Sequence, residues 1–109
     1  MSPLLQQREA LRKAARLEQW RQARERLAAC LGRHLRGQRI WLFGSITEPG
    51  RFNAASDVDI AIDALPDGVS IYTLTALLEE EMKRPVDVAY LPESRLRDKI
   101  ISQGELWTV

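Results

Sequence analysis

Apolar residues recur at steps of three and four positions along the first third of the chain, with arginines on either side of them. The positions of this stripe are Leu11, Ala14, Leu17, Trp20, Ala23, Leu27 and Leu31. Such spacing predicts one long amphipathic helix. Ser2 suits the N-cap and Pro3 the first turn, while Gly32 or Gly37 would end the helix. We therefore expect a helix within residues 1–37, with an N-terminal part that projects beyond the rest of the domain.

Three short apolar runs follow and predict strands. They read RIWLF at residues 39–43, DVDIAID at 57–63 and VDVAYL at 86–91. In the second run apolar and acidic residues alternate, so one face of that strand is expected to lie against the core.

Further helices and a last strand are expected around these runs. Ser70 is placed to cap a helix over residues 71–84, and a second helix is expected over about 93–102. The closing ELWTV suits a short edge strand. Together the elements predict the α/β (α+β) class, with a small mixed sheet, in a single domain of residues 1–109.

Composition excludes several classes of protein. The chain has 109 residues, 45% of them apolar and 28% charged, which is typical of one globular domain. Cys30 is the only cysteine, so an internal disulfide framework is excluded and a reducing cytoplasm is expected. We expect Cys30 to be a small buried residue and His34 a residue of the helix end. With no long apolar run and no signal-peptide pattern, no membrane association is expected.

Charge is distributed unevenly along the chain. Residues 1–40 carry ten Arg or Lys and three Glu, a net charge of +7, which leaves −6 for residues 41–109. Two interpretations stay open: a solvated helix face, or a surface for an acidic partner or nucleic acid.

Three aspartates are the main candidates for chemistry. Asp57 and Asp59 share a strand face, with Cβ atoms roughly 7 Å apart. Asp87 lies in another apolar strand, and a βαβ connection over residues 64–85 would bring it to the same face. Clustered carboxylates repel one another unless a cation lies between them, and they are the ligands that Mg²⁺ prefers. Asp63 is expected to face solvent.

Gly44-Ser45 directly follows the first strand and adds a phosphate-binding candidate. Glycine allows close backbone approach, and the serine hydroxyl with nearby N–H groups can hold phosphate oxygens. No Gly-Lys-Ser/Thr follows, so the loop is not a Walker A motif.

The ordered set of Gly44-Ser45, Ser56-Asp57-Val58-Asp59 and Val86-Asp87-Val88 resembles the nucleotidyltransferase superfamily that includes DNA polymerase beta. The resemblance covers about residues 38–109, which would form the catalytic core. It implies the polymerase-beta-like fold, a mixed sheet with helices packed on one face. It also implies two Mg²⁺ ions held by Asp57, Asp59 and Asp87, and a nucleoside triphosphate, ATP, held by Gly44 and Ser45. Asp87 would help to activate the attacking hydroxyl.

One departure from the family pattern concerns the loop. Members often carry Arg-Gly soon after Gly-Ser, whereas this chain has Thr47-Glu48-Pro49-Gly50-Arg51. Arg51 is the candidate to supply that charge from a shifted position.

The chain is similar to the minimal nucleotidyltransferases in particular. That resemblance implies a small helical HEPN-type protein as partner in a toxin–antitoxin module. This chain would be the antitoxin and would transfer AMP to a hydroxyl of the toxin, such as that of a tyrosine. The basic N-terminal helix would suit docking to that partner or self-association into a homo-oligomer.

Two other functions stay open. The chain could neutralise its partner by binding alone, without catalysis. It could instead modify a small molecule or a nucleic acid with the help of another subunit, and a nucleic acid would bind with a steep salt dependence.

Overall fold

A mixed four-stranded sheet organises the chain, and the computed structural model describes residues 2–109 of it. The strands are β1 (Arg39–Phe43), β2 (Val58–Ile62), β3 (Val86–Tyr90) and β4 (Glu105–Thr108). Their spatial order is β3-β2-β1-β4, in which only β2 and β3 run parallel. All four strands were expected from the sequence, and their arrangement confirms the predicted α+β class.

The helices are α1 (Pro3–His34), α2 (Ile71–Met82) and α3 (Arg97–Gln103). Two short 3₁₀ helices, η1 (Gly44–Thr47) and η2 (Leu91–Glu93), follow β1 and β3 directly. Both predicted N-caps are confirmed: Ser2 Oγ accepts a hydrogen bond from Leu5 N at 3.2 Å, and Ser70 Oγ accepts one from Thr73 N at 3.1 Å.

Two helices differ in length from the prediction. α2 ends at Met82, because Lys83 adopts a left-handed conformation with φ of 59°. α3 begins at Arg97, because the segment that contains Pro92 forms η2 instead of the first turn of the helix.

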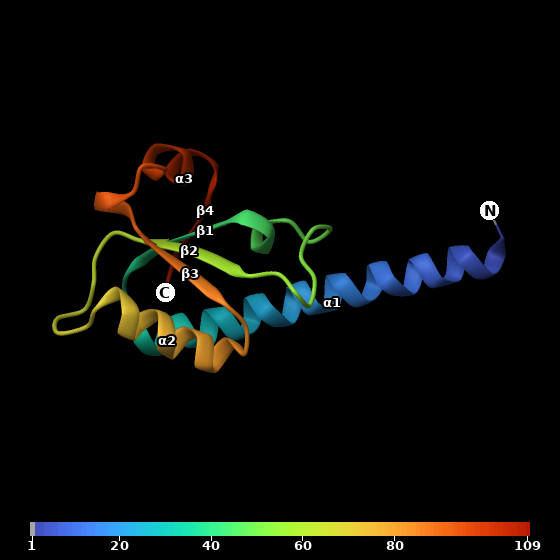
Figure 1. Cartoon of the computed structure of the whole chain (residues 1–109), viewed down its shortest axis with the longest axis horizontal. Coiled ribbons are helices and arrows are strands. Elements are labelled where there is room, and N and C mark those ends of the chain that lie inside the picture. Colours follow the sequence, from blue (N-terminus) through green and yellow to red (C-terminus); the bar gives the residue numbers. More distant parts are fainter. Residues whose placement is uncertain (1) are drawn as a thin grey trace.

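Only the C-terminal half of α1 packs against the sheet. Its buried residues are Ala23, Leu27, Cys30 and Leu31. In the N-terminal half, Leu11 and Leu17 are 70% and 51% exposed although they continue the apolar stripe. Figure 1 shows this half as a straight rod that leaves the domain, as expected, and the molecule is 57 Å long but 28 Å by 20 Å across.

The helices lie on both faces of the sheet. The larger core combines α1 and α2 with Val58, Ile60 and Ile62 of β2. A smaller cluster on the other face joins Trp41 and Ala61 to Ile100 of α3. Figure 1 shows α1 and α2 on one side of the strands and α3 on the opposite side. The two long helices share one face, as the resemblance implied. α3 departs from that expectation and lies on the other face, because Trp41 and Ala61 are apolar there and pack with Ile100.

Within residues 2–109, no helix is long and apolar enough to cross a membrane.

The projecting half of α1 buries nothing against the domain, so it should contribute little to stability. We expect deletion of residues 2–14 to change the free energy of unfolding by less than about 0.5 kcal/mol. Chemical denaturation measures this change. A deletion extended to residue 24 should abolish cooperative unfolding, because it removes Trp20 and Ala23 from the core. A large loss in the free energy of unfolding from the shorter deletion would contradict the conclusion that the N-terminal half of α1 is not part of the core.

Candidate active site

The parallel pairing of β2 with β3 brings two of the predicted aspartates side by side. Asp59 and Asp87 are direct partners in this ladder. Asp57 comes just before β2 and two residues from Asp59, so the strand period directs it to the same face. Asp57 and Asp87 are exposed, whereas Asp59 is half-buried. This is the face on which Ala61 packs toward α3, opposite to the core formed with α1 and α2.

The three carboxylates influence one another electrostatically. Partial burial raises the pKa of Asp59, and the negative charges of Asp87 and Asp57 raise it further. The oxygens of these three carboxylates do not form a tight cluster. Within residues 2–109, a group of metal-binding side chains whose ligand atoms all lie within 4.8 Å of one another is found elsewhere, at Cys30, His34 and Glu81.

Gly44 closes one side of the acidic group. Its φ is +72°, a conformation that favours glycine, and a Cβ at this position would collide with Oδ2 of Asp59. The contact follows from the antiparallel register, in which Phe43 is the partner of Asp59. Gly44 therefore lets the backbone that starts η1 approach a carboxylate directly.

Ser45 lies in the same turn and is half-buried. The backbone carbonyl of Ser45 accepts a hydrogen bond from Glu48 N at 2.9 Å, and Oγ1 of Thr47 donates one to the carbonyl of Gly44 at 2.8 Å. These bonds fix the turn in a compact form. The structure thus brings Gly44 and Ser45 to the edge of the acidic group.

Arg51 lies farther along the loop, with 68% of its side chain exposed and ion-paired to Glu48. It lines a cleft of about 440 Å³ between η1 and α3, together with Gly44, Thr47, Lys99 and Gln103. Lys99 gives the cleft a second cation that sequence reasoning missed. A helix was expected around residue 99, but nothing in its pattern indicated which part of the sheet it would face.

The residues of this site fit the magnesium ions that the resemblance implies. Asp57, Asp59 and Asp87 provide hard carboxylate oxygens on one sheet face, the donor type that Mg²⁺ requires. Burial, followed by the charges of Asp87 and Asp57, raises the pKa of Asp59, and a cation at this place would favour its ionised form. The glycine beside Asp59 lets the backbone that starts η1 lie directly against that carboxylate, with no side chain between them.

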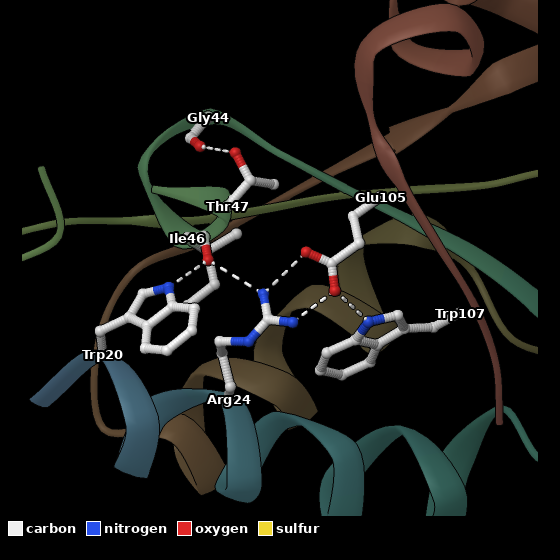
Figure 2. A network of polar contacts seen from close by, with 7 residues as sticks. All are labelled: Trp20, Arg24, Gly44, Ile46, Thr47, Glu105 and Trp107. Atoms are coloured by element: carbon white, nitrogen blue, oxygen red, sulfur yellow. Dashed lines mark hydrogen bonds and ion pairs between the residues drawn. The ribbon is translucent and has the colours of Figure 1, made fainter. Parts of the chain in front are cut away.

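A network of polar contacts holds η1 against α1 and β4 (Figure 2). Trp20 Nε1 donates to the carbonyl of Ile46 at 2.8 Å, and Arg24 Nη1 donates to the same oxygen at 3.2 Å. The guanidinium of Arg24 also pairs with both carboxylate oxygens of Glu105, one of them at 3.0 Å. Trp107 Nε1 donates to Glu105 Oε2 at 2.6 Å.

Arg24 is the centre of this network. Its side chain is only 19% exposed, and its guanidinium carbon lies 4.8 Å and 5.1 Å from the ring centroids of Trp20 and Trp107. The hydrogen bond from Arg24 lowers the pKa of Glu105. Because Ile46 belongs to η1, these contacts fix the turn that carries Gly44 and Ser45. Arg24 and Glu105 are positioning residues that sequence reasoning did not identify.

The comparison with protein families agrees with this arrangement. A family model described as polymerase beta, nucleotidyltransferase matches residues 25–107. No curated protein and no solved structure matches the chain.

Asp59→Asn should stabilise the metal-free protein, because it removes a partly buried charge that two like charges repel. We expect the melting temperature, measured in a chelator, to rise by a few degrees. Asp67→Asn, at an exposed turn, is the matched control and should leave it unchanged. A fall in the melting temperature of Asp59→Asn would show that Asp59 has a favourable partner within the fold.

Arg24→Met should destabilise the fold and loosen η1, since it leaves Glu105 and the Ile46 carbonyl without their shared donor. We expect a loss of about 1–3 kcal/mol in the free energy of unfolding. Arg21→Met is the matched control on the same helix, because Arg21 is 51% exposed and, within residues 2–109, pairs only with Glu18 and Glu25. Its cost should stay below about 1 kcal/mol. Equal losses in the two variants would contradict a special role for Arg24.

The ion pair of Arg24 with Glu105 should make the stability of the fold depend on pH. The folded-state pKa of Glu105 is lowered from 4.5, so its ionised form stabilises the fold above that pH. The stabilisation should disappear as the pH falls from 4.5 through the lower folded value. The difference in melting temperature between the native chain and Glu105→Gln should therefore narrow on acidification. A difference that stays constant would mean that Glu105 acts by packing alone.

Proposed function

The chain belongs to the polymerase beta nucleotidyltransferase family, and on this premise we propose that it transfers AMP from ATP to a hydroxyl of a partner protein. The observation that carries the proposal is the pairing of Asp59 with Asp87 beside the close backbone of Gly44. It supports the proposal, because carboxylates are the ligands that Mg²⁺ prefers and the adjoining turn approaches them with its backbone. Proteins of this family generally use a nucleoside triphosphate and Mg²⁺.

Asp57, Asp59 and Asp87 would hold the metal ions. When bound, Mg²⁺ supplies positive charge that neutralises the phosphate oxygens and the leaving pyrophosphate. The hydroxyl of Ser45 and the backbone at Gly44 bind the triphosphate. Lys99 and Arg51, which line the adjoining cleft, attract its negative charge.

The transfer itself is an in-line displacement. The acceptor oxygen attacks the α-phosphorus, the bond from that phosphorus to the bridging oxygen breaks, and pyrophosphate leaves. Asp87, which is exposed to solvent, accepts the proton of the acceptor hydroxyl. The products are a protein-bound AMP ester and pyrophosphate.

The exposed half of α1 supports a protein as the acceptor. Leu4, Leu5, Leu11 and Leu17 are each more than half exposed on this helix, and the first forty residues carry a net charge of +7. An apolar and basic surface of this kind suits a helical partner with acidic flanks. The small helical HEPN-type toxin implied by the resemblance is the partner that we propose, with this chain as the antitoxin. The lone Cys30 supports a reducing compartment, the cytoplasm, as the place of the reaction.

Nucleotide binding is the first test. The melting temperature should be measured with ATP, GTP, CTP and UTP, each with and without Mg²⁺. A ligand at 100 times its dissociation constant stabilises the native state by about 2.7 kcal/mol, a shift on the order of 10 °C for a domain of this size. We expect such a Mg²⁺-dependent shift with ATP, its loss in Asp57→Asn, and its retention in Asp67→Asn. A shift that persists unchanged in Asp57→Asn would place the nucleotide elsewhere.

Transfer is tested with a co-expressed HEPN-type partner. Intact mass spectrometry should show one or more AMP groups on the partner with the native chain and none with Asp57→Asn. Binding of the partner without modification would favour an antitoxin that acts by contact alone. AMP transfer in the absence of any protein partner would favour a small-molecule acceptor.

A further inference from the structure

Three side chains with metal-binding atoms meet between α1 and α2. Cys30 and His34 lie one helical turn apart on α1, and Glu81 reaches them from α2. Glu81 Oε2 lies 2.6 Å from Sγ of Cys30 and 2.9 Å from Nε2 of His34. All three ligand atoms lie within 4.8 Å of one another.

This cluster is separate from the acidic site. Cys30 packs in the core that α1 and α2 form with Val58 and Ile60, whereas Asp59 faces the side of Ala61 and α3. The cluster therefore lies on the opposite face of the sheet from the proposed catalytic aspartates. A function for it has to be independent of nucleotide transfer.

We propose that Cys30, His34 and Glu81 form a zinc site that joins the C-terminal end of α1 to α2. A thiolate, an imidazole and a carboxylate are the ligand types that zinc takes, and three protein ligands with a water as the fourth form a common tetrahedral set. Mg²⁺, which prefers oxygen ligands alone, does not suit this combination.

The distances are compatible with this ion after small movements. Tetrahedral zinc with bonds of 2.0–2.3 Å keeps the ligand atoms of this set about 3.3–3.6 Å apart. The two contacts of Glu81 Oε2 are shorter than this, because hydrogen bonds hold the atoms there. Side-chain rotations that move these atoms by about 1 Å would open the space for the ion. Cys30 and His34 already lie on the same face of α1, because four residues separate them.

The surroundings allow the ion to enter and balance its charge. Cys30 is fully buried, but His34 and Glu81 are 27% and 29% exposed, which leaves a path from solvent. On binding, the thiol of Cys30 loses its proton to water, so that the thiolate and the carboxylate together neutralise Zn²⁺. Arg33 holds the other oxygen of Glu81, with Nη2 at 3.0 Å, and so orients the carboxylate.

A nucleophilic role for Cys30 does not fit the same geometry. Its thiol donates to Glu81, not to His34, and its 0% exposure keeps it from any substrate. Cys30 is buried, as the sequence predicted. His34 lies in the last turn of α1, also as predicted. What the sequence did not predict is that both residues meet Glu81.

Titration of the metal-free full-length chain with Co²⁺ and Zn²⁺ tests the site. We expect one Co²⁺ per chain, with the visible bands of tetrahedral cobalt and a thiolate charge-transfer band, and displacement of Co²⁺ by Zn²⁺. Cys30→Ser should abolish the charge-transfer band. Glu81→Gln, which keeps the length of the side chain and removes its charge, should weaken zinc affinity by about tenfold or more. The metal-free melting temperature of each variant shows that it is folded.

Two controls make the result specific. Glu80→Gln, at the exposed neighbouring position of α2, should bind zinc as the native chain does. Asp57→Asn should also keep its zinc affinity, because it alters only the acidic site. Absence of the thiolate band, unchanged affinity in Glu81→Gln, or loss of zinc binding in Asp57→Asn would each overturn the proposal.

Discussion

The guanidinium of Arg24 joins three parts of the chain that are distant in sequence. It binds the carbonyl of Ile46 in η1 and the carboxylate of Glu105 in β4, which lies 81 residues away. The side chain of Arg24 is only 19% exposed, and both of its partners also accept hydrogen bonds from tryptophan indoles. Because Arg24 makes these hydrogen bonds simultaneously, the turn at Gly44 has a fixed position relative to both α1 and β4. The geometry of the candidate active site depends on that position.

Two polar clusters on opposite faces of the sheet illustrate different ways of tolerating charge. Arg33 neutralises Glu81 beside the buried Cys30, so that cluster is satisfied within the fold. Within residues 2–109, the three aspartates have no cationic side chain paired with them, and burial and mutual repulsion raise the pKa of Asp59. A fold retains an arrangement of this kind where function needs it, because its cost in stability is recovered when a cation binds.

The unequal covering of the sheet shapes the cleft. α1 and α2 bury one face almost completely, with Leu27, Ile60 and Leu78 fully removed from solvent. On the other face, Ile100 of the seven-residue α3 and Leu91 of η2 pack with Trp41 and Ala61. The remaining space between η1 and α3 forms the cleft that Arg51 and Lys99 line. A longer helix on that face would have filled it.

The sequence by itself determined the elements and which face of each is apolar, because side-chain periods of 3.6 and 2 are local properties. From these came the capped helices, the four strands, the shared face of Asp57 and Asp59 and the expectation that a βαβ connection brings Asp87 beside them. The tertiary structure decided which residues each face contacts. Arg24 meets Glu105 and Ile46, and Cys30 and His34 meet Glu81. Lys99 lines the cleft. It also put α3 on the second face of the sheet and left half of α1 outside the core. A periodic pattern predicts that one face of an element is buried, but which residues that face contacts depends on how distant segments pack together.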